Sequence, residues 1–259
     1  MSRPLSGRVR PRSPLVRGEF QRRKPLPIAI FDIDGTIFRS SLTIELFKHL
    51  VRLGIFHAGI MQSVAAAEQE WLNRAGSYED YIIEVVKAYQ KAIVGKKKND
   101  IVKACRRVIT QHRLQTYRYT KNLLAKIRPR YFTIGISGSP LEVVAEYNKF
   151  LKFDKLYGWE FGVDEKGRYT DKILHAPSQY KKELIVRYLA SHNLSLKKSI
   201  GVGDTESDIG FLSLVEKPIA FNPHANLARV ARKNNWTVVI ERKDLIAEFK
   251  PSKVKYLRS

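Results

Sequence analysis

The sequence has a single cysteine, few acidic residues and no long apolar run, and each shortage excludes a class of protein. One cysteine, Cys105, among 259 residues excludes a disulfide framework and indicates a reducing compartment. No apolar run reaches the roughly 18 residues needed to cross a bilayer. The arginine-rich N-terminus lacks the continuous apolar segment of a secretory signal. We therefore expect a soluble, cytoplasmic protein in which Cys105 is an ordinary helix residue.

The scarcity of acids gives the chain a strong positive charge. Aspartate and glutamate number 25 against 47 lysines and arginines, a formal net charge of +22. Such a field favours nucleic acid, anionic lipid headgroups or phosphorylated substrates, although a solvated basic surface explains the same charge. Residues 1–26 form a basic, proline-interrupted leader that we expect to be disordered, and residues 246–259 a short basic tail. Both tails offer non-specific contact with polyanions.

Apolar runs and helical periodicity alternate along most of the chain. Strand-like runs lie at about 27–31, 131–136, 156–162, 169–174, 199–203, 219–221 and 237–240. Helical spacing occupies about 42–53, 57–75, 78–94, 98–128, 141–151, 178–192 and 225–234. This alternation predicts an α/β fold with a doubly wound parallel sheet. Residues 27–38 and 129–245 would form the core domain, and the mainly helical block 39–128 would be a cap inserted after the first strand.

Two aspartates end the first of these strands. In Ile28-Ala29-Ile30-Phe31-Asp32-Ile33-Asp34-Gly35-Thr36, Asp32 follows an apolar run and Asp34 comes two residues later. Side chains two apart in an extended segment point to the same side. Two neighbouring carboxylates repel each other unless a cation or hydrogen-bond donors compensate. The stretch therefore requires a metal ion and partners from elsewhere in the chain.

Polar groups follow two further strands in the same way. Ser137 and Gly138 end one apolar run, and Asp204 and Asp208 follow another. Ligands of open α/β sheets bind outside the carboxyl ends of the strands, so one crevice can gather all these groups. A hydroxyl, an exposed backbone N–H and the ammonium of Lys181 suit a phosphoryl group. Carboxylates suit Mg²⁺, which prefers oxygen ligands.

The ordered set of motifs resembles the phosphoserine-phosphatase-like subfamily (HAD-IB) of the haloacid dehalogenase-like superfamily, whose members carry a helical cap after the first motif. Each motif alone is common, whereas the complete set in this order is specific. The resemblance spans Ile28 to Ile240 and rests on Asp32-Ile33-Asp34-Gly35-Thr36, Ser137-Gly138, Lys181, Gly203-Asp204-Thr205-Glu206-Ser207-Asp208 and Phe221-Asn222-Pro223.

The resemblance implies a role for each motif residue. Asp32 would be the nucleophile that forms an aspartyl-phosphate. Asp34 would protonate the leaving oxygen and then activate water. Ser137 and the backbone of Gly138 would hold the phosphoryl group, and Lys181 would neutralise its charge and orient Asp32.

The resemblance also implies a magnesium site. Asp32, the backbone carbonyl of Asp34 and Asp204 would bind Mg²⁺, with Asp208 as a ligand or in a supporting position. Lys181 and Lys182 are adjacent, so either could be the phosphate-binding lysine. We choose Lys181 because the family lysine starts a helix.

One departure from the subfamily concerns the substrate. Phosphoserine phosphatases tend to carry a glutamate shortly after the first motif, which holds the substrate's amino group. Here Arg39-Ser40-Ser41-Leu42 occupies that region, and no acid follows until Glu45. This argues against phosphoserine, and Arg39 and Ser41 could line a pocket for another polar or anionic substrate.

We therefore expect a Mg²⁺-dependent phosphatase acting on a small phosphorylated metabolite. Two alternatives remain open. One is a basic nucleic-acid- or ribosome-associated protein that uses the fold as a scaffold, although a scaffold has no need of Asp34 or Lys181. The other is a phosphotransferase whose acceptor is not water.

Overall fold

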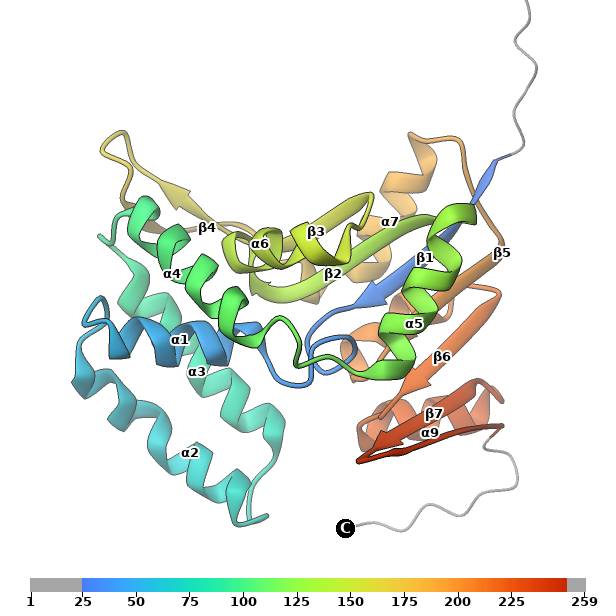
Figure 1. Cartoon of the computed structure of the whole chain (residues 1–259), viewed down its shortest axis with the longest axis horizontal. Helices are drawn as coiled ribbons and strands as arrows, with labels where there is room; N and C mark the ends of the chain where they lie inside the picture. Colours follow the sequence, from blue (N-terminus) through green and yellow to red (C-terminus); the bar gives the residue numbers. More distant parts are fainter. Residues whose placement is uncertain (1–24, 251–259) are drawn as a thin grey trace, which may run out of the picture.

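A sheet of eight strands forms the centre of the molecule (Figure 1). The computed structural model describes residues 25–250, so the leader expected over 1–26 lies almost entirely outside the described residues. The strand order is β4-β3-β2-β1-β5-β6-β7-β8. The strands are β1 (Leu26–Asp32), β2 (Phe132–Pro140), β3 (Lys155–Val163), β4 (Tyr169–His175), β5 (Leu194–Gly203), β6 (Lys217–Phe221), β7 (Thr237–Arg242) and β8 (Leu245–Phe249).

The six central strands run parallel, and the two edge strands, β4 and β8, pair antiparallel with their neighbours. In the middle of the sheet, Ile30 of β1 lies opposite Ile134 of β2 and Gly201 of β5. The predicted α/β fold with a largely parallel sheet is confirmed. The prediction of a tail over residues 246–259 differs from the structure in its first residues. The chain turns after β7, and residues 245–249 form β8 at the edge of the sheet.

Alternate residues of β1 face two different layers. Ile28 and Ile30 belong to a core cluster with apolar side chains of α7, α8 and α9, whereas Ala29 and Phe31 belong to a second cluster with α6 and the inserted helices. Figure 1 shows α5 and α6 on one face of the sheet and α7 on the other. These helices are α6 (Leu141–Leu151), α7 (Lys181–Ala190), α8 (Ile209–Leu212) and α9 (Ala225–Lys233). Because helices cover both faces of the sheet, the polar residues at the carboxyl ends of the parallel strands lie together along one end of the strands.

The insertion between β1 and β2 is helical, as predicted, but its helices are shorter than predicted. The stretch 57–75 is a 3₁₀ turn followed by α2, and 98–128 is two helices separated by residues 113–117. The chain leaves the helical path there because Arg39 N–H donates to Gln115 and Tyr117 N–H donates to Ile37, each at 2.9 Å. The elements are α1 (Leu42–Arg52), η1 (Ala58–Met61), α2 (Gln62–Leu72), α3 (Tyr78–Ile93), α4 (Lys98–His112) and α5 (Arg118–Ile127).

Helix α5 is attached to the sheet side of the molecule. The carboxylate of Glu241 on β7 accepts hydrogen bonds from the backbone N–H groups of Arg118 and Tyr119, at 2.8 and 2.9 Å. The ring of Tyr119 stacks on Phe221 of β6 at 6.1 Å between centroids. We therefore propose that the cap ends before α5, and not at residue 128. Within residues 25–250, no helix is long and apolar enough to cross a membrane.

Candidate active site

Asp32 and Asp34 lie together at the end of β1, where Gly35 turns the chain. Asp32 is buried and Asp34 is half-buried. Gly35 has a positive φ of 78°, and a Cβ atom at this position would lie 2.1 Å from Oδ2 of Asp204. The turn therefore requires glycine for two reasons. Its backbone conformation favours glycine, and the side chain of Asp204, which follows β5, approaches too closely for a Cβ atom.

Lys181 connects the first and last aspartate motifs. Its Nζ donates to Oδ1 of Asp32 and to Oδ1 of Asp208, each at 2.6 Å, and the side chain is only 3% exposed. Burial alone would lower the pKa of Lys181, but the carboxylates of Asp208 and Asp32 outweigh it and raise the pKa. Lys182 is exposed. The structure therefore brings Lys181, as chosen from the sequence, to the predicted site.

Asp208 has protein donors at both carboxylate oxygens. Oδ1 accepts from Lys181, and Oδ2 accepts from the backbone N–H groups of Asp204 and Thr205 at 3.0 Å each. The carboxylate packs so closely that a Cβ atom on Gly203 would lie 2.5 Å from it. Asp208 is thus positioned to orient Lys181 and the loop that carries Asp204.

Three buried carboxylates form a cluster in which one oxygen of each lies within 4.8 Å of the others: Asp32, Asp204 and Asp208. Burial, reinforced by the neighbouring negative charges, raises the pKa of Asp32 and Asp204. Oδ2 of Asp32 is buried and has no hydrogen-bond partner among the described residues. An all-oxygen donor set with an unpartnered carboxylate oxygen fits a hard divalent cation such as Mg²⁺.

Three donors hold the carboxylate of Asp34. Leu42 N–H donates to Oδ1 at 2.6 Å, the hydroxyl of Ser137 donates to Oδ2, and the hydroxyl of Ser139 lies 3.0 Å from both oxygens. Burial raises the pKa of Asp34, and these hydrogen bonds oppose the increase only in part. A carboxyl with a raised pKa is suited to donating and accepting a proton near neutral pH.

Ser139 is the site residue that sequence reasoning missed. It also accepts a hydrogen bond from Thr43 N–H at 3.0 Å, so it links Asp34 to the first cap helix. The available signal was its spacing, because Ser139 lies two residues after Ser137 in an extended segment and points to the same side. Ser137 was predicted to bind phosphate. In the structure its buried hydroxyl donates to Asp34, and Gly138 rather than Ser137 lines the cavity.

A cavity of about 550 Å³ lies over these groups, between the strand ends and the cap. Asp32, Asp34, Lys181 and Asp204 line its inner end. Ser41 lines the cavity as anticipated, but Arg39 is exposed and its guanidinium lies 5.7 Å from the ring of Tyr117. The cap contributes mainly residues of α3 and its approach: Ser77, Tyr78, Glu79, Ile82, Ile83 and Val86.

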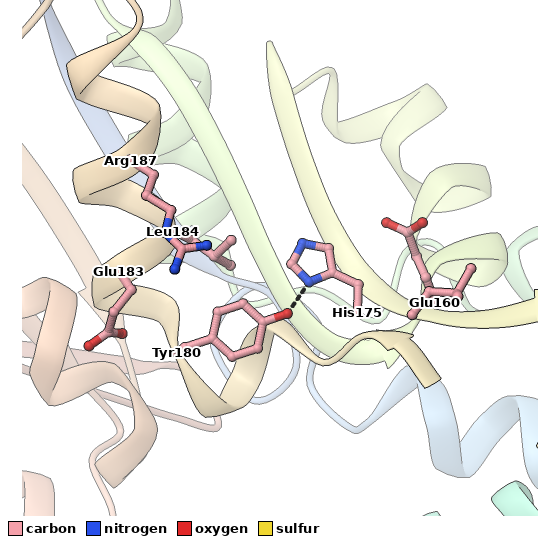
Figure 2. A pocket seen from close by; sticks show the side chains of 7 residues that line it. Glu160, His175, Tyr180, Glu183, Leu184 and Arg187 are labelled. Atoms are coloured by element: carbon pink, nitrogen blue, oxygen red, sulfur yellow. Dashed lines mark hydrogen bonds between the residues drawn. The ribbon is translucent and has the colours of Figure 1, made fainter. Parts of the chain in front are cut away.

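A second cavity, of about 580 Å³, lies on the other side of α7. Figure 2 shows the side chains around it, including the hydrogen bond between His175 and the hydroxyl of Tyr180. Glu160, Glu183 and Arg187 also line it. The predicted catalytic and metal-binding residues all lie outside its lining, whereas Asp32, Asp34, Lys181 and Asp204 line the first cavity.

Comparisons with known proteins agree with this geometry. The chain is 24% identical over 231 residues to an inhibition of morphological differentiation protein from Streptomyces azureus, covering 87% of this chain and 82% of that protein. It is 22% identical over 231 residues to a histidinol-phosphatase from Neisseria meningitidis serogroup C (strain 8013), covering 82% and 97%. A phosphoserine phosphatase solved as an analogue of its phospho-aspartyl intermediate shares the fold, with a TM-score of 0.58, 18% identity and coverage of 85% and 96%.

A family model also matches the chain, from β1 through the inserted helices to β5 and α8. The model for haloacid dehalogenase-like hydrolases matches residues 29–213, which include every aspartate of the site and Lys181. The strand order, the helical insertion after β1 and the carboxylate cluster are thus accompanied by a match over more than half of the sequence. The chain belongs to the haloacid dehalogenase-like hydrolase family.

Proposed function

We propose that the protein is a Mg²⁺-dependent phosphatase that hydrolyses a small-molecule phosphomonoester through an aspartyl-phosphate on Asp32. One observation carries this proposal. Lys181 occupies one carboxylate oxygen of Asp32, and the other oxygen is buried, unpartnered among the described residues, and belongs to a side chain that lines the cavity. A carboxylate fixed in this way has one oxygen free to attack phosphorus, and the oxygen that accepts from Lys181 keeps a second lone pair for a cation.

The first chemical step forms a bond between an oxygen of Asp32 and phosphorus. The bond from phosphorus to the leaving alcohol breaks, and the carboxyl of Asp34 gives its proton to the departing oxygen. In the second step the Asp34 carboxylate takes a proton from a water molecule, which attacks phosphorus and breaks its bond to Asp32. Phosphate leaves, and both aspartates return to their starting states.

The remaining residues bind and position. The ammonium of Lys181 offsets the negative charge of the phosphoryl group and holds Asp32. Asp208 uses its own oxygens to orient Lys181 and the Asp204 loop. The cap side chains that line the cavity limit access of bulk water to the reacting atoms.

Asp32 and Asp204, with the backbone carbonyl of Asp34, would hold Mg²⁺. When bound, the ion supplies positive charge that polarises the phosphoryl group. Asp208 fits a supporting position better than a ligand position, because it does not line the cavity and both of its oxygens have protein donors, Oδ2 two of them.

The proposal is tested by trapping the intermediate in the variant Asp34→Asn. An aryl phosphate has a good leaving group, so Asp32 should be phosphorylated without the acid, but hydrolysis should be slow without the base. Intact mass spectrometry should then show a gain of one phosphoryl group with Mg²⁺ present, and peptide mapping should locate it on Asp32. An unmodified protein, together with no phosphate release by the wild type, would exclude the mechanism.

A further inference from the structure

The cavity has a charge opposite to that of the protein as a whole. The chain carries a net charge of +22, yet five carboxylates and one lysine line this cavity. The lysine, Lys181, is already paired with Asp32 and Asp208. Permanent charge that selects the part of the substrate beyond phosphorus therefore comes from the carboxylates that take no part in the phosphoryl site.

Two carboxylates fit this description, Glu79 and Glu206. Glu79 lies in the first turn of α3 on the cap, and Glu206 begins the short 3₁₀ helix η4 (Glu206–Asp208) on the core. Both are exposed, and neither forms an ion pair with another described residue. Glu206 accepts a hydrogen bond from the amide of Asn226. Arg229 reaches this rim indirectly, by donating to Asn226, and does not itself line the cavity.

The wall that the cap contributes to the cavity is largely apolar. Tyr78, Ile82, Ile83 and Val86 of α3 line the cavity, and Ile83 is 42% exposed. Apolar surface left open to water in a cavity is stabilised when an apolar part of a ligand covers it. The cavity thus offers the leaving group both an apolar wall and two carboxylates outside the phosphoryl site.

A substrate carboxylate meets no arginine and no unpaired lysine in this cavity. Every arginine of the described chain lies outside the lining, and the single lysine, Lys181, is paired with Asp32 and Asp208. The remaining basic side chain of the lining is His224, whose ring packs edge-to-face on Tyr78 at 6.2 Å. A second anionic group on the substrate would therefore face Glu79 and Glu206 without a permanent positive charge beside it, which disfavours it.

From these observations we infer that the substrate is the phosphate ester of an alcohol with an apolar body and an ammonium group, and without a carboxylate. This inference rests on the proposed phosphatase function, because it assigns the phosphoryl group to the inner end of the cavity. Glu79 and Glu206 are then specificity-determining residues that read the charge of the leaving group.

Three aryl phosphates with the same reacting centre test the inference: phosphotyramine, which carries an ammonium group, para-ethylphenyl phosphate, which is neutral, and the phosphate ester of para-hydroxyphenylpropanoate, which carries a carboxylate. We expect kcat/KM with Mg²⁺ to fall in this order, with about a tenfold span between the charged probes at low salt. The span should shrink at high salt, because exposed charges are screened.

The double variant Glu79→Gln/Glu206→Gln should bring the three probes to similar kcat/KM values, and Glu79→Lys should favour the carboxylate probe. Glu165→Gln, in the exposed turn between β3 and β4, is the matched control and should retain the wild-type order. Equal rates for all three probes in the wild type, or an order that survives the double variant, would overturn the inference while leaving the phosphatase function intact. No phosphate release from any probe would overturn both.

Discussion

The inner and outer ends of the cavity are built in opposite ways. At the inner end three charged side chains are held by several partners: Lys181 by two carboxylates, Asp34 by three donors, and Asp208 at both oxygens. At the outer end the cap presents apolar side chains of α3, and Glu79 of the cap and Glu206 of the core form no ion pairs among the described residues. Under the proposed phosphatase function, the inner end would carry the reaction and the outer end would select the substrate.

The helical cap and the core domain are joined by a few defined contacts. The loop between α3 and α4 pairs with β4, where Gly95 N–H donates to Tyr169 at 2.8 Å and Tyr169 N–H donates to Lys96 at 2.9 Å. Near the cavity, the ring of Tyr78 meets His224 edge-to-face at 6.2 Å. The C-terminal part of α3 is thus fixed by backbone hydrogen bonds, while its N-terminal end meets the core through side chains.

The largest effect is expected at the inner end, from Asp32→Asn. The amide removes the nucleophile, so kcat should fall by about 10⁴-fold or more, as in other enzymes that lose a nucleophile. The rate of phosphate release from an aryl phosphate with Mg²⁺ measures the fall in kcat, and circular dichroism checks that the variant is folded. Asp171→Asn, at an exposed position of β4, should retain full activity. Substantial turnover by Asp32→Asn would show that another group attacks phosphorus.

Asp204→Asn should abolish stabilisation by Mg²⁺. Burial raises the pKa of Asp204, so the metal-free folded protein binds more protons than the unfolded chain. Its stability should therefore fall as the pH rises from the ordinary carboxyl range through the raised pKa. Mg²⁺ at a hundredfold excess over Kd should restore about 2.7 kcal/mol at neutral pH, or about 5–10 °C in Tm.

Thermal unfolding with and without Mg²⁺, at neutral and acidic pH, measures this effect. Asp204→Asn should flatten the pH dependence and remove the metal-induced shift, whereas Asp171→Asn should keep both. An undiminished shift in Asp204→Asn would place the cation elsewhere.

Ser139→Ala probes the junction between the two ends. The variant loses a hydrogen bond that lowers the pKa of Asp34, so the limb of the kcat profile that Asp34 controls should move to higher pH. We expect kcat to fall about tenfold, equivalent to roughly 1.4 kcal/mol, with little change in KM. Ser213→Ala, at an exposed position after α8, is the control. An unshifted pH profile would leave Ser139 a purely structural role.

The smallest effect is expected at the outer end, from Ile83→Ala. The change removes apolar surface that a bulky leaving group would cover, at about 0.8 kcal/mol per buried methylene. Loss of one such contact should raise KM for an alkylphenyl phosphate about fourfold and leave kcat nearly unchanged. Steady-state kinetics against Val186→Ala, exposed on α7, measures the difference. A fall in kcat with unchanged KM would contradict the assignment of substrate binding to the outer end and of the reaction to the inner end.

Most of the fold could be predicted because its signals are local. Apolar runs that end in aspartate marked β1 and β5, and they marked the strand ends where the site lies. Element lengths were less predictable where tertiary contacts cut a periodic pattern. The helix predicted over 98–128 ends at His112 because residues 115 and 117 pair with the loop after β1. Leu114, in the segment between the two helices, is 76% exposed.

The same distinction applies within the site. The sequence pointed to Asp32, Asp34 and Asp204 because each follows an apolar strand, and the family resemblance favoured Lys181 over Lys182 because the family lysine starts a helix. It did not identify Ser139, whose importance depends on Thr43, 96 residues away. Nor did it indicate that Ser137 donates to Asp34, since a serine hydroxyl can serve either a phosphate or a carboxylate.

By itself, the sequence determined the class of fold, the position of the helical insertion and the chemistry at the strand ends, because periodicity and charged residue types act over a few neighbours. Only the tertiary structure decided which lysine pairs with Asp32, that α5 packs on the sheet, and that a chain of charge +22 encloses a cavity whose charged lining residues are mostly carboxylates. Those outcomes depend on which side chains, distant in the sequence, come together in a small volume that contains little water. Interactions between individual charged and polar groups are strong there, because the local dielectric constant is low.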